Sequence, residues 1–132
     1  MKPQATSFLS AADRAIANRH TVLTVNIPDQ AARLAYYAQF YAAQALIFER
    51  TGKIAKTHKG VAAQFHLLAT AETLLTPSLA AELSAAYYFK DAADYNASAA
   101  LAITPDQARD AIAVAERFVD VVRQALASPP AA

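Results

Sequence analysis

The sequence predicts an all-α protein, an up-and-down bundle of about five helices. The chain has only two glycines in 132 residues, Gly52 and Gly60, and both fall in one short stretch. Alanine and leucine, which are strong helix formers, are abundant between the breaks. Three prolines, Pro28, Pro77 and Pro105, stand where new apolar repeats begin, and the first turn of a helix tolerates proline.

The composition predicts one globular domain over residues 1–127, followed by a disordered tail over residues 128–132. A hydrophobic content of 55% with 17% charged residues is enough for a real core. The absence of cysteine excludes a disulfide scaffold, a thiolate metal site and a cysteine nucleophile. A net charge of +1 provides no general basic field, so any contact with nucleic acid would be local.

Nothing in the sequence indicates a metal, a cofactor or a membrane segment. The three histidines fall on different predicted elements, without the paired spacing of a metal site. Charged residues interrupt the N-terminus, and polar residues interrupt the most apolar window, so neither a signal peptide nor a membrane helix is expected. We therefore expect a cytoplasmic protein without membrane contact.

Five helices are expected in order, and a polar loop is expected over Asn96–Ile103. The first is weakly amphipathic, and the last has the clearest signals because Thr104 and Gln107 form a capping box with Pro105 at the first helical position. The expected spans are about Ser7 to Leu23, Pro28 to about Arg50, about His58 to Thr70, Pro77 to about Tyr95, and a helix that starts at Pro105.

The second predicted helix has two different faces. A face of mostly small residues suits close packing inside the monomer; it comprises Leu34, Ala38, Tyr41, Ala42, Ala45 and Leu46. The other face mixes aromatic with polar groups, a composition typical of subunit interfaces. It predicts a homodimer, with Tyr36, Tyr37, Phe40 and Phe48 as the interface candidates.

A basic turn, Lys56-Thr57-His58-Lys59-Gly60, precedes the third predicted helix. Thr57 is placed to cap that helix. Helix-start amides, two ammonium groups and the His58 imidazole together suit a phosphate of RNA or a nucleotide. The alternative is that His58 orients the turn by hydrogen bonding, while Lys56 and Lys59 are solvated.

Lys90 shares the apolar stripe of the fourth predicted helix with Leu83, Ala86 and Ala93. A charge in such a stripe is costly unless it is paired or reaches water. Lys90 therefore either pairs with Asp94, one turn away, or belongs to a remnant of a phosphate-binding cleft. Three tyrosines of this helix can stack on bases or pack in the aromatic core or in an interface: Tyr87, Tyr88 and Tyr95.

Three landmarks in order resemble the HEPN domain, specifically its small stand-alone bacterial and archaeal members, often found beside a minimal nucleotidyltransferase. They are the aromatic and alanine-rich run from Ala35 to Ala43, the turn Lys56-Thr57-His58-Lys59-Gly60, and Ala93-Asp94-Tyr95. The resemblance covers nearly the whole chain. It implies a helical bundle that dimerises and forms a cleft at the ends of the paired helices. Many members are metal-independent ribonucleases, including toxins of toxin–antitoxin pairs.

The ribonuclease signature that the resemblance implies is an arginine followed a few residues later by a histidine, at the end of the fourth helix. Here Lys90 stands at the arginine position and Tyr95 at the histidine position. Lysine cannot form the bidentate fork that arginine forms, and tyrosine is a poor proton shuttle at neutral pH. Lys90 and Tyr95 are thus the catalytic candidates of a site that has lost its usual pair.

The expected function is a dimeric HEPN-like binding protein, related to toxin–antitoxin systems or to nucleotides or RNA. Its expected partners are a second copy, a nucleotidyltransferase antitoxin, and RNA or a nucleotide. One alternative is an active RNA endonuclease toxin that uses Lys90, Tyr95 and His58 in a divergent site. Another alternative is a purely structural protein-interaction module.

Overall fold

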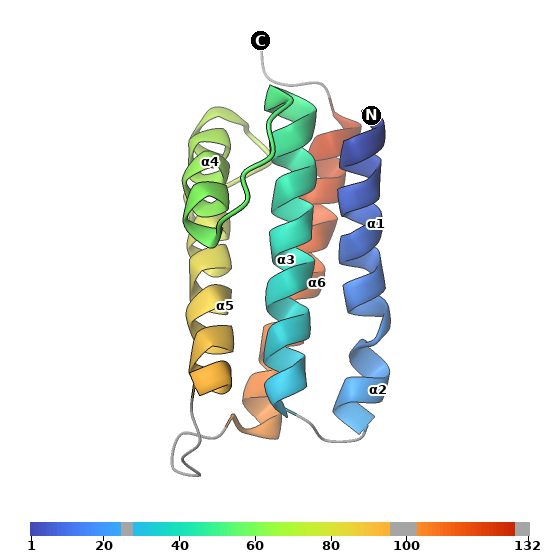
Figure 1. The fold of residues 1–132 in the computed structure, drawn as a ribbon, viewed down its shortest axis with the longest axis vertical. Helices are drawn as coiled ribbons and strands as arrows, with labels where there is room; N and C mark the ends of the chain where they lie inside the picture. The colour runs from blue at the N-terminus through green and yellow to red at the C-terminus, as the bar shows by residue number, and fades with distance from the viewer. Residues whose placement is uncertain (25–27, 96–102, 129–132) are drawn as a thin grey trace.

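The computed structural model describes residues 1–24, 28–95 and 103–128, and these residues form a helical up-and-down bundle (Figure 1). Its helices are α1 (Pro3–Ala17), α2 (Arg19–Thr24), α3 (Pro28–Thr51), α4 (His58–Ala71), α5 (Pro77–Tyr95) and α6 (Pro105–Ala127). Within these ranges there is no strand, which confirms the predicted all-α class. No helix in the described ranges has both the length and the apolarity needed to cross a membrane.

Helix α3 is the central element of the bundle. Helices α1 and α2 lie along one side of it, α4 and α5 lie along the other, and α6 lies behind it in the view of Figure 1. The predicted small-residue face explains this position, because Ala38, Ala42, Ala45 and Leu46 are fully buried there. Small side chains allow neighbouring helix backbones to approach α3 closely. The prediction that this face packs inside the monomer is confirmed.

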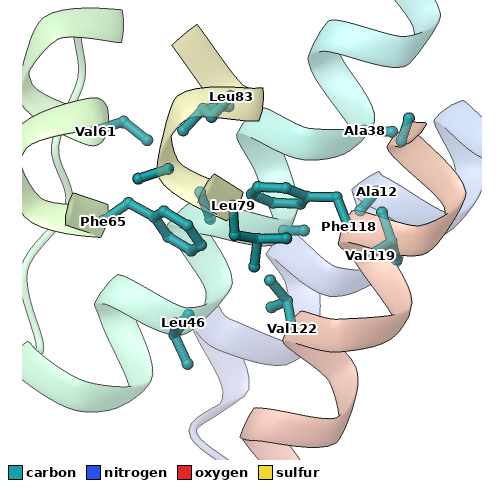
Figure 2. Packing of buried hydrophobic residues seen from close by; sticks show 14 of the residues in the cluster. Ala12, Ala38, Leu46, Val61, Phe65, Leu79, Leu83, Phe118, Val119 and Val122 are labelled. Atoms are coloured by element: carbon teal, nitrogen blue, oxygen red, sulfur yellow. The ribbon is translucent and has the colours of Figure 1, made fainter. Parts of the chain in front are cut away.

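Large apolar side chains from the outer helices fill the space around α3. Phe65 of α4 and Phe118 of α6 are fully buried, with ring centroids 5.2 Å apart. Leu83 of α5 and Leu46 of α3 point into the same cluster (Figure 2). Burying a side chain of this size contributes about 1.5–3 kcal/mol, so this cluster fixes α4 and α5 against the rest of the bundle.

The predicted first helix differs from the observed structure at its start and by a break within its span. It begins earlier, at Pro3, because Lys2 takes an extended conformation and proline is favoured in the first helical turn. It also breaks at Asn18, which ends α1 before α2 begins at Arg19. Asparagine has low helix propensity and competes for backbone hydrogen bonds; here its side-chain amide donates to the carbonyl of Arg14.

The C-terminal end of α3 is held by Arg50. Its guanidinium donates to Glu72 Oε1 at 2.9 Å, to the carbonyl of Ala125 at 2.7 Å and to the carbonyl of Ser128 at 3.2 Å. Glu72 ends α4, and the two carbonyls belong to the end of α6. These four residues, here called the Arg50 cluster, join the ends of three helices. Ser128 is therefore part of the fold, whereas residues 129–132 of the predicted tail lie outside the described residues. The predicted loop over Asn96–Ile103 also lies outside them except for Ile103, which is buried.

The connection from α3 to α4 turns back at Gly52. This residue has a φ of +72°, a left-handed conformation that glycine adopts without strain, and its N–H donates to the carbonyl of Phe48 at 2.8 Å. Further along, the buried side chain of Gln44 donates to the carbonyl of Ala55 at 3.0 Å. The loop is therefore tied to α3 immediately before α4 begins.

Candidate functional site

Thr57 and Gly60 position His58 as the first residue of α4. The hydroxyl of Thr57 accepts a hydrogen bond from the N–H of Gly60 at 3.0 Å, which confirms the predicted cap. A Cβ atom on Gly60 would lie 3.1 Å from that hydroxyl oxygen, tighter than ordinary contact. A glycine here therefore allows the cap to close, and the cap sets where the His58 side chain leaves the helix.

The His58 ring is held by two tyrosines from different helices. Its Nδ1 atom lies 3.1 Å from the hydroxyl of Tyr36 on α3. Its ring stacks on Tyr87 of α5, with centroids 3.7 Å apart and planes within 8°. Helices α3, α4 and α5 thus meet at this imidazole.

The protonation states in this pair follow from burial. Burial lowers the pKa of His58, and the nearby positive charge of Lys90 lowers it further. Burial raises the pKa of Tyr36, which is 3% exposed, so its hydroxyl stays protonated. A neutral His58 has one ring N–H, so when the Tyr36 hydroxyl donates to Nδ1 the imidazole carries its proton on Nε2.

Lys90 joins the same group of residues. Its Nζ lies 2.9 Å from Asp94 Oδ2, which confirms the predicted pair along the helix. The same nitrogen lies 5.6 Å from the ring centroid of Tyr36 and 5.5 Å from that of Tyr87, within cation–π range. The bond to Asp94 raises the pKa of Lys90 despite its burial, so Lys90 is charged at neutral pH.

Asp94 is shared between two cations. Its Oδ1 accepts from Arg33 Nε on α3 at 2.6 Å while its Oδ2 accepts from Lys90. The bonds from Lys90 and Arg33 lower the pKa of Asp94, although burial opposes them. One carboxylate is thus in direct contact with two cations, and Asp91 is a further carboxylate that acts on Lys90. We call Arg33, Tyr36, His58, Tyr87, Lys90 and Asp94 the His58 cluster.

The structure joins two features that the sequence presented separately. His58 of the basic turn and Lys90 of the α5 stripe belong to one cluster. Lys56 and Lys59 flank His58 in the chain with exposed side chains, and Thr57 is engaged in the helix cap. Tyr95 ends α5, and its side chain lies outside the described residues, so its predicted role stays a prediction.

Tyr36 was expected in a subunit interface, and that expectation is wrong for this residue. Its ring is buried inside the monomer, against His58 and Tyr87. Helices α4 and α5 cover this part of α3, which helical periodicity alone does not reveal. The other interface candidates stay closer to the surface: Tyr37 is 40% exposed, and Phe40 and Phe48 are half-buried.

Arg33 is a member of the His58 cluster that was missed as a site residue. Its spacing could have identified it, because Arg33 lies three residues before Tyr36 on α3 and so shares a helix face with a recognised candidate.

Comparison with known proteins supports one family. The sequence model described as HEPN domain matches residues 2–125 of the chain. No curated protein matches it.

Proposed function

The chain belongs to the HEPN domain family, and on that premise we propose that it binds a phosphate group of a nucleotide or RNA at the His58 cluster without cutting RNA. The family itself supports a nucleotide-related or RNA-related role, or one in a toxin–antitoxin pair. The single observation that carries the finer proposal is that the neutral His58 and the charged Lys90 converge between the same two tyrosines.

The groups of this cluster suit an anion because they can donate hydrogen bonds. Tyr36 occupies Nδ1 of His58, which leaves Nε2–H as the donor of the imidazole. Lys90 has three N–H donors, one of which reaches Asp94. The start of α4 adds backbone amides and the positive end of the helix dipole. Lys56 and Lys59 add charge at the same helix start.

The same geometry disfavours proton transfer to and from RNA. Lys90 is a point charge that Asp94 already partly neutralises, and it lacks the fork with which arginine holds a phosphate in two places. His58 is fixed in one tautomer by Tyr36 and stacked on Tyr87. Tyr95 stands at the position of the family's histidine, and the tyrosine side chain, with an unperturbed pKa near 10, is a poor proton shuttle at pH 7 compared with histidine.

The proposal is tested by titrating the protein with adenosine 5′-monophosphate and with adenosine. We expect only the phosphate-bearing compound to raise the melting temperature, because a ligand that binds the folded state alone stabilises it. Lys90→Met should weaken its binding about tenfold or more, which corresponds to about 1.4 kcal/mol. Lys53→Met removes the same charge from an exposed residue of the α3–α4 loop and is the matched control. Equal binding of adenosine, or equal loss in both variants, would refute a phosphate site at Lys90.

Cleavage is tested separately with total RNA. We expect purified protein to leave the RNA intact and its expression not to arrest growth. RNA cleavage that disappears in Lys90→Ala would favour the endonuclease alternative, and Tyr95→Phe would then test the tyrosine. If no nucleotide or RNA shifts the melting temperature, the result would favour the alternative that the protein is a purely structural protein-interaction module.

We also propose that the protein is a homodimer through the surface of α3 that bears Tyr37, Phe40 and Phe48. Tyr37 is 40% exposed and lies beside Tyr36, with centroids 5.1 Å apart, so this surface adjoins the His58 cluster. A charge buried in such an interface is costly. Tyr37→Glu should therefore halve the mass measured by light scattering, whereas Tyr88→Glu, on exposed α5 surface, should not.

A nucleotidyltransferase is the partner protein that this proposal names. If the protein is half of a toxin–antitoxin pair, a nucleotidyltransferase encoded beside it should co-purify with it from cells that express both. Failure of the two to co-purify would remove this partner without affecting phosphate binding by the isolated protein.

A further inference from the structure

A groove lies between α5 and α6, with α3 as its floor. Its volume is about 360 Å³, within the range of small-molecule sites. Five of the eleven residues that line it are alanines from all three helices, including Ala35, Ala85 and Ala111, and Phe89 and Val114 add larger apolar groups. The groove therefore offers an apolar surface to a ligand.

Two polar residues that line this groove, Gln39 and Glu82, each have a buried acceptor atom. Gln39 is 1% exposed, and its Oε1 has no hydrogen-bond partner among the described residues. Glu82 Oε2 is also buried without such a partner, while Glu82 Oε1 accepts from Arg117 at 2.9 Å. A buried polar atom that lacks a partner is costly, and it gains most from a ligand that supplies one.

The charged residues around these atoms determine whether a positively or a negatively charged ligand is favoured. Both acceptors need N–H or O–H donors, and Glu82 carries a negative charge. Asp110 lines the α6 wall and adds another carboxylate. An anion would meet repulsion here, whereas an ammonium group supplies several donors and a positive charge.

We propose that this groove binds a small aromatic or alkyl amine in its protonated form. The apolar body lies against the alanines, and the ammonium group donates to Gln39 Oε1 and Glu82 Oε2. The site is independent of the proposed phosphate site because it uses other residues of α3 and α5 and has the opposite charge preference.

The probe is 2-phenylethylamine, titrated into the full-length protein and followed by the amide NMR signals of the groove. We expect concentration-dependent shifts at Ala85, Ala86 and Ala111 and a higher melting temperature. Phenylacetate has the same ring and the opposite charge, and it should cause neither change. Ala85→Phe fills the groove from an exposed position and should abolish binding, whereas Ala113→Phe, on the exposed part of α6 outside the groove, should not.

Gln39→Leu separates binding from packing. Replacing a buried acceptor that lacks a donor with an apolar group should leave the melting temperature unchanged or higher, and should weaken amine binding about tenfold or more. A variant that is less stable and binds the amine as well as the native protein would show that Gln39 has a purely structural role. Absence of amine-induced NMR shifts would overturn the proposal and leave the groove without a ligand. A lower mass for Ala85→Phe in light scattering would also overturn it, because the groove would then be covered by a second copy of the chain.

Discussion

The two ends of α3 carry two polar clusters that differ in how their charges are satisfied. In the Arg50 cluster one guanidinium meets one carboxylate and two helix carbonyls, and the side chains of Arg50 and Glu72 are each only 10% exposed. In the His58 cluster two cations share Asp94, and Lys90 lies within cation–π range of the Tyr36 and Tyr87 rings. The first cluster pairs one cation with one carboxylate, whereas in the second one carboxylate serves two cations.

This difference indicates what each cluster is for. In the Arg50 cluster each cation contact is to the end of another helix, so this cluster serves to hold three helix ends together. A cluster in which one carboxylate serves two cations beside an imidazole has capacity for an anion. Mutations should therefore separate the two clusters into one that controls stability and one that controls binding.

The largest effect is expected from Arg50→Ala. It leaves Glu72 without its cation and two carbonyls without a donor, and removing one partner of a buried ion pair costs about 3–5 kcal/mol. Urea denaturation measures the loss. The Arg50→Met, Glu72→Met double variant should lose less, because no charge is left unpaired. A loss below about 1 kcal/mol in the single variant would contradict the structural role of this cluster.

Two helix caps provide a matched pair. Thr57→Ala and Thr104→Ala each remove a hydroxyl that caps a helix, so each should lower the free energy of unfolding by about 1 kcal/mol. Only Thr57→Ala should also weaken binding of adenosine 5′-monophosphate, because Thr57 fixes the start of α4 beside His58. Equal binding of adenosine 5′-monophosphate by the two variants would show that the Thr57 cap does not contribute to the binding site.

Tyr36→Phe keeps the ring but removes the hydroxyl that donates to His58. The loss of one part-buried hydrogen bond should cost about 0.5–1.5 kcal/mol. Binding should weaken as well, since His58 Nδ1 can then take the proton and Nε2 loses its role as donor. Tyr88→Phe is the control, because Tyr88 is 70% exposed and its change should alter neither quantity.

The smallest effect is a pH dependence of stability. Because the folded pKa of His58 lies below its ordinary value of 6.5, the unfolded chain binds a proton at that histidine more readily than the folded protein does. His58 should therefore lower stability progressively as pH falls from about 7 to about 5. The lowered pKa of Asp94 acts only below its ordinary 3.8, and the raised pKa of Lys90 acts only above 10.5. His58→Gln should reduce the change in the free energy of unfolding between about pH 7 and about pH 5. If this pH dependence is unchanged in the variant, it arises from other groups.

Most of the fold could be predicted because its signals are local. The Thr104–Gln107 capping box and Pro105 fix where α6 begins, and the observed box has both of its hydrogen bonds. Pro28 and Gly52 bracket α3 in the same way. The break at Asn18 was missed because a single weak helix former decides it, and the apolar pattern continues across it.

The candidate site could be predicted only in part, because it depends on which helices become neighbours. Periodicity grouped Tyr36 with Tyr37 and Phe40, but it could not tell that α4 and α5 would cover Tyr36. His58 and Lys90 each stood out alone, one for its basic turn and the other for its apolar stripe. Their meeting depends on the packing of Phe65 and Leu83, which sets α4 and α5 against α3.

The stacking of tyrosines around His58 has a practical consequence. The chain has no tryptophan and six tyrosines, so its near-ultraviolet absorption and emission come mainly from phenol rings. Tyr36, Tyr37, Tyr87 and Tyr88 form a connected series of ring contacts beside the imidazole. A ligand bound beside these rings should alter the intrinsic tyrosine fluorescence of the unlabelled protein, so fluorescence can report binding at the His58 cluster.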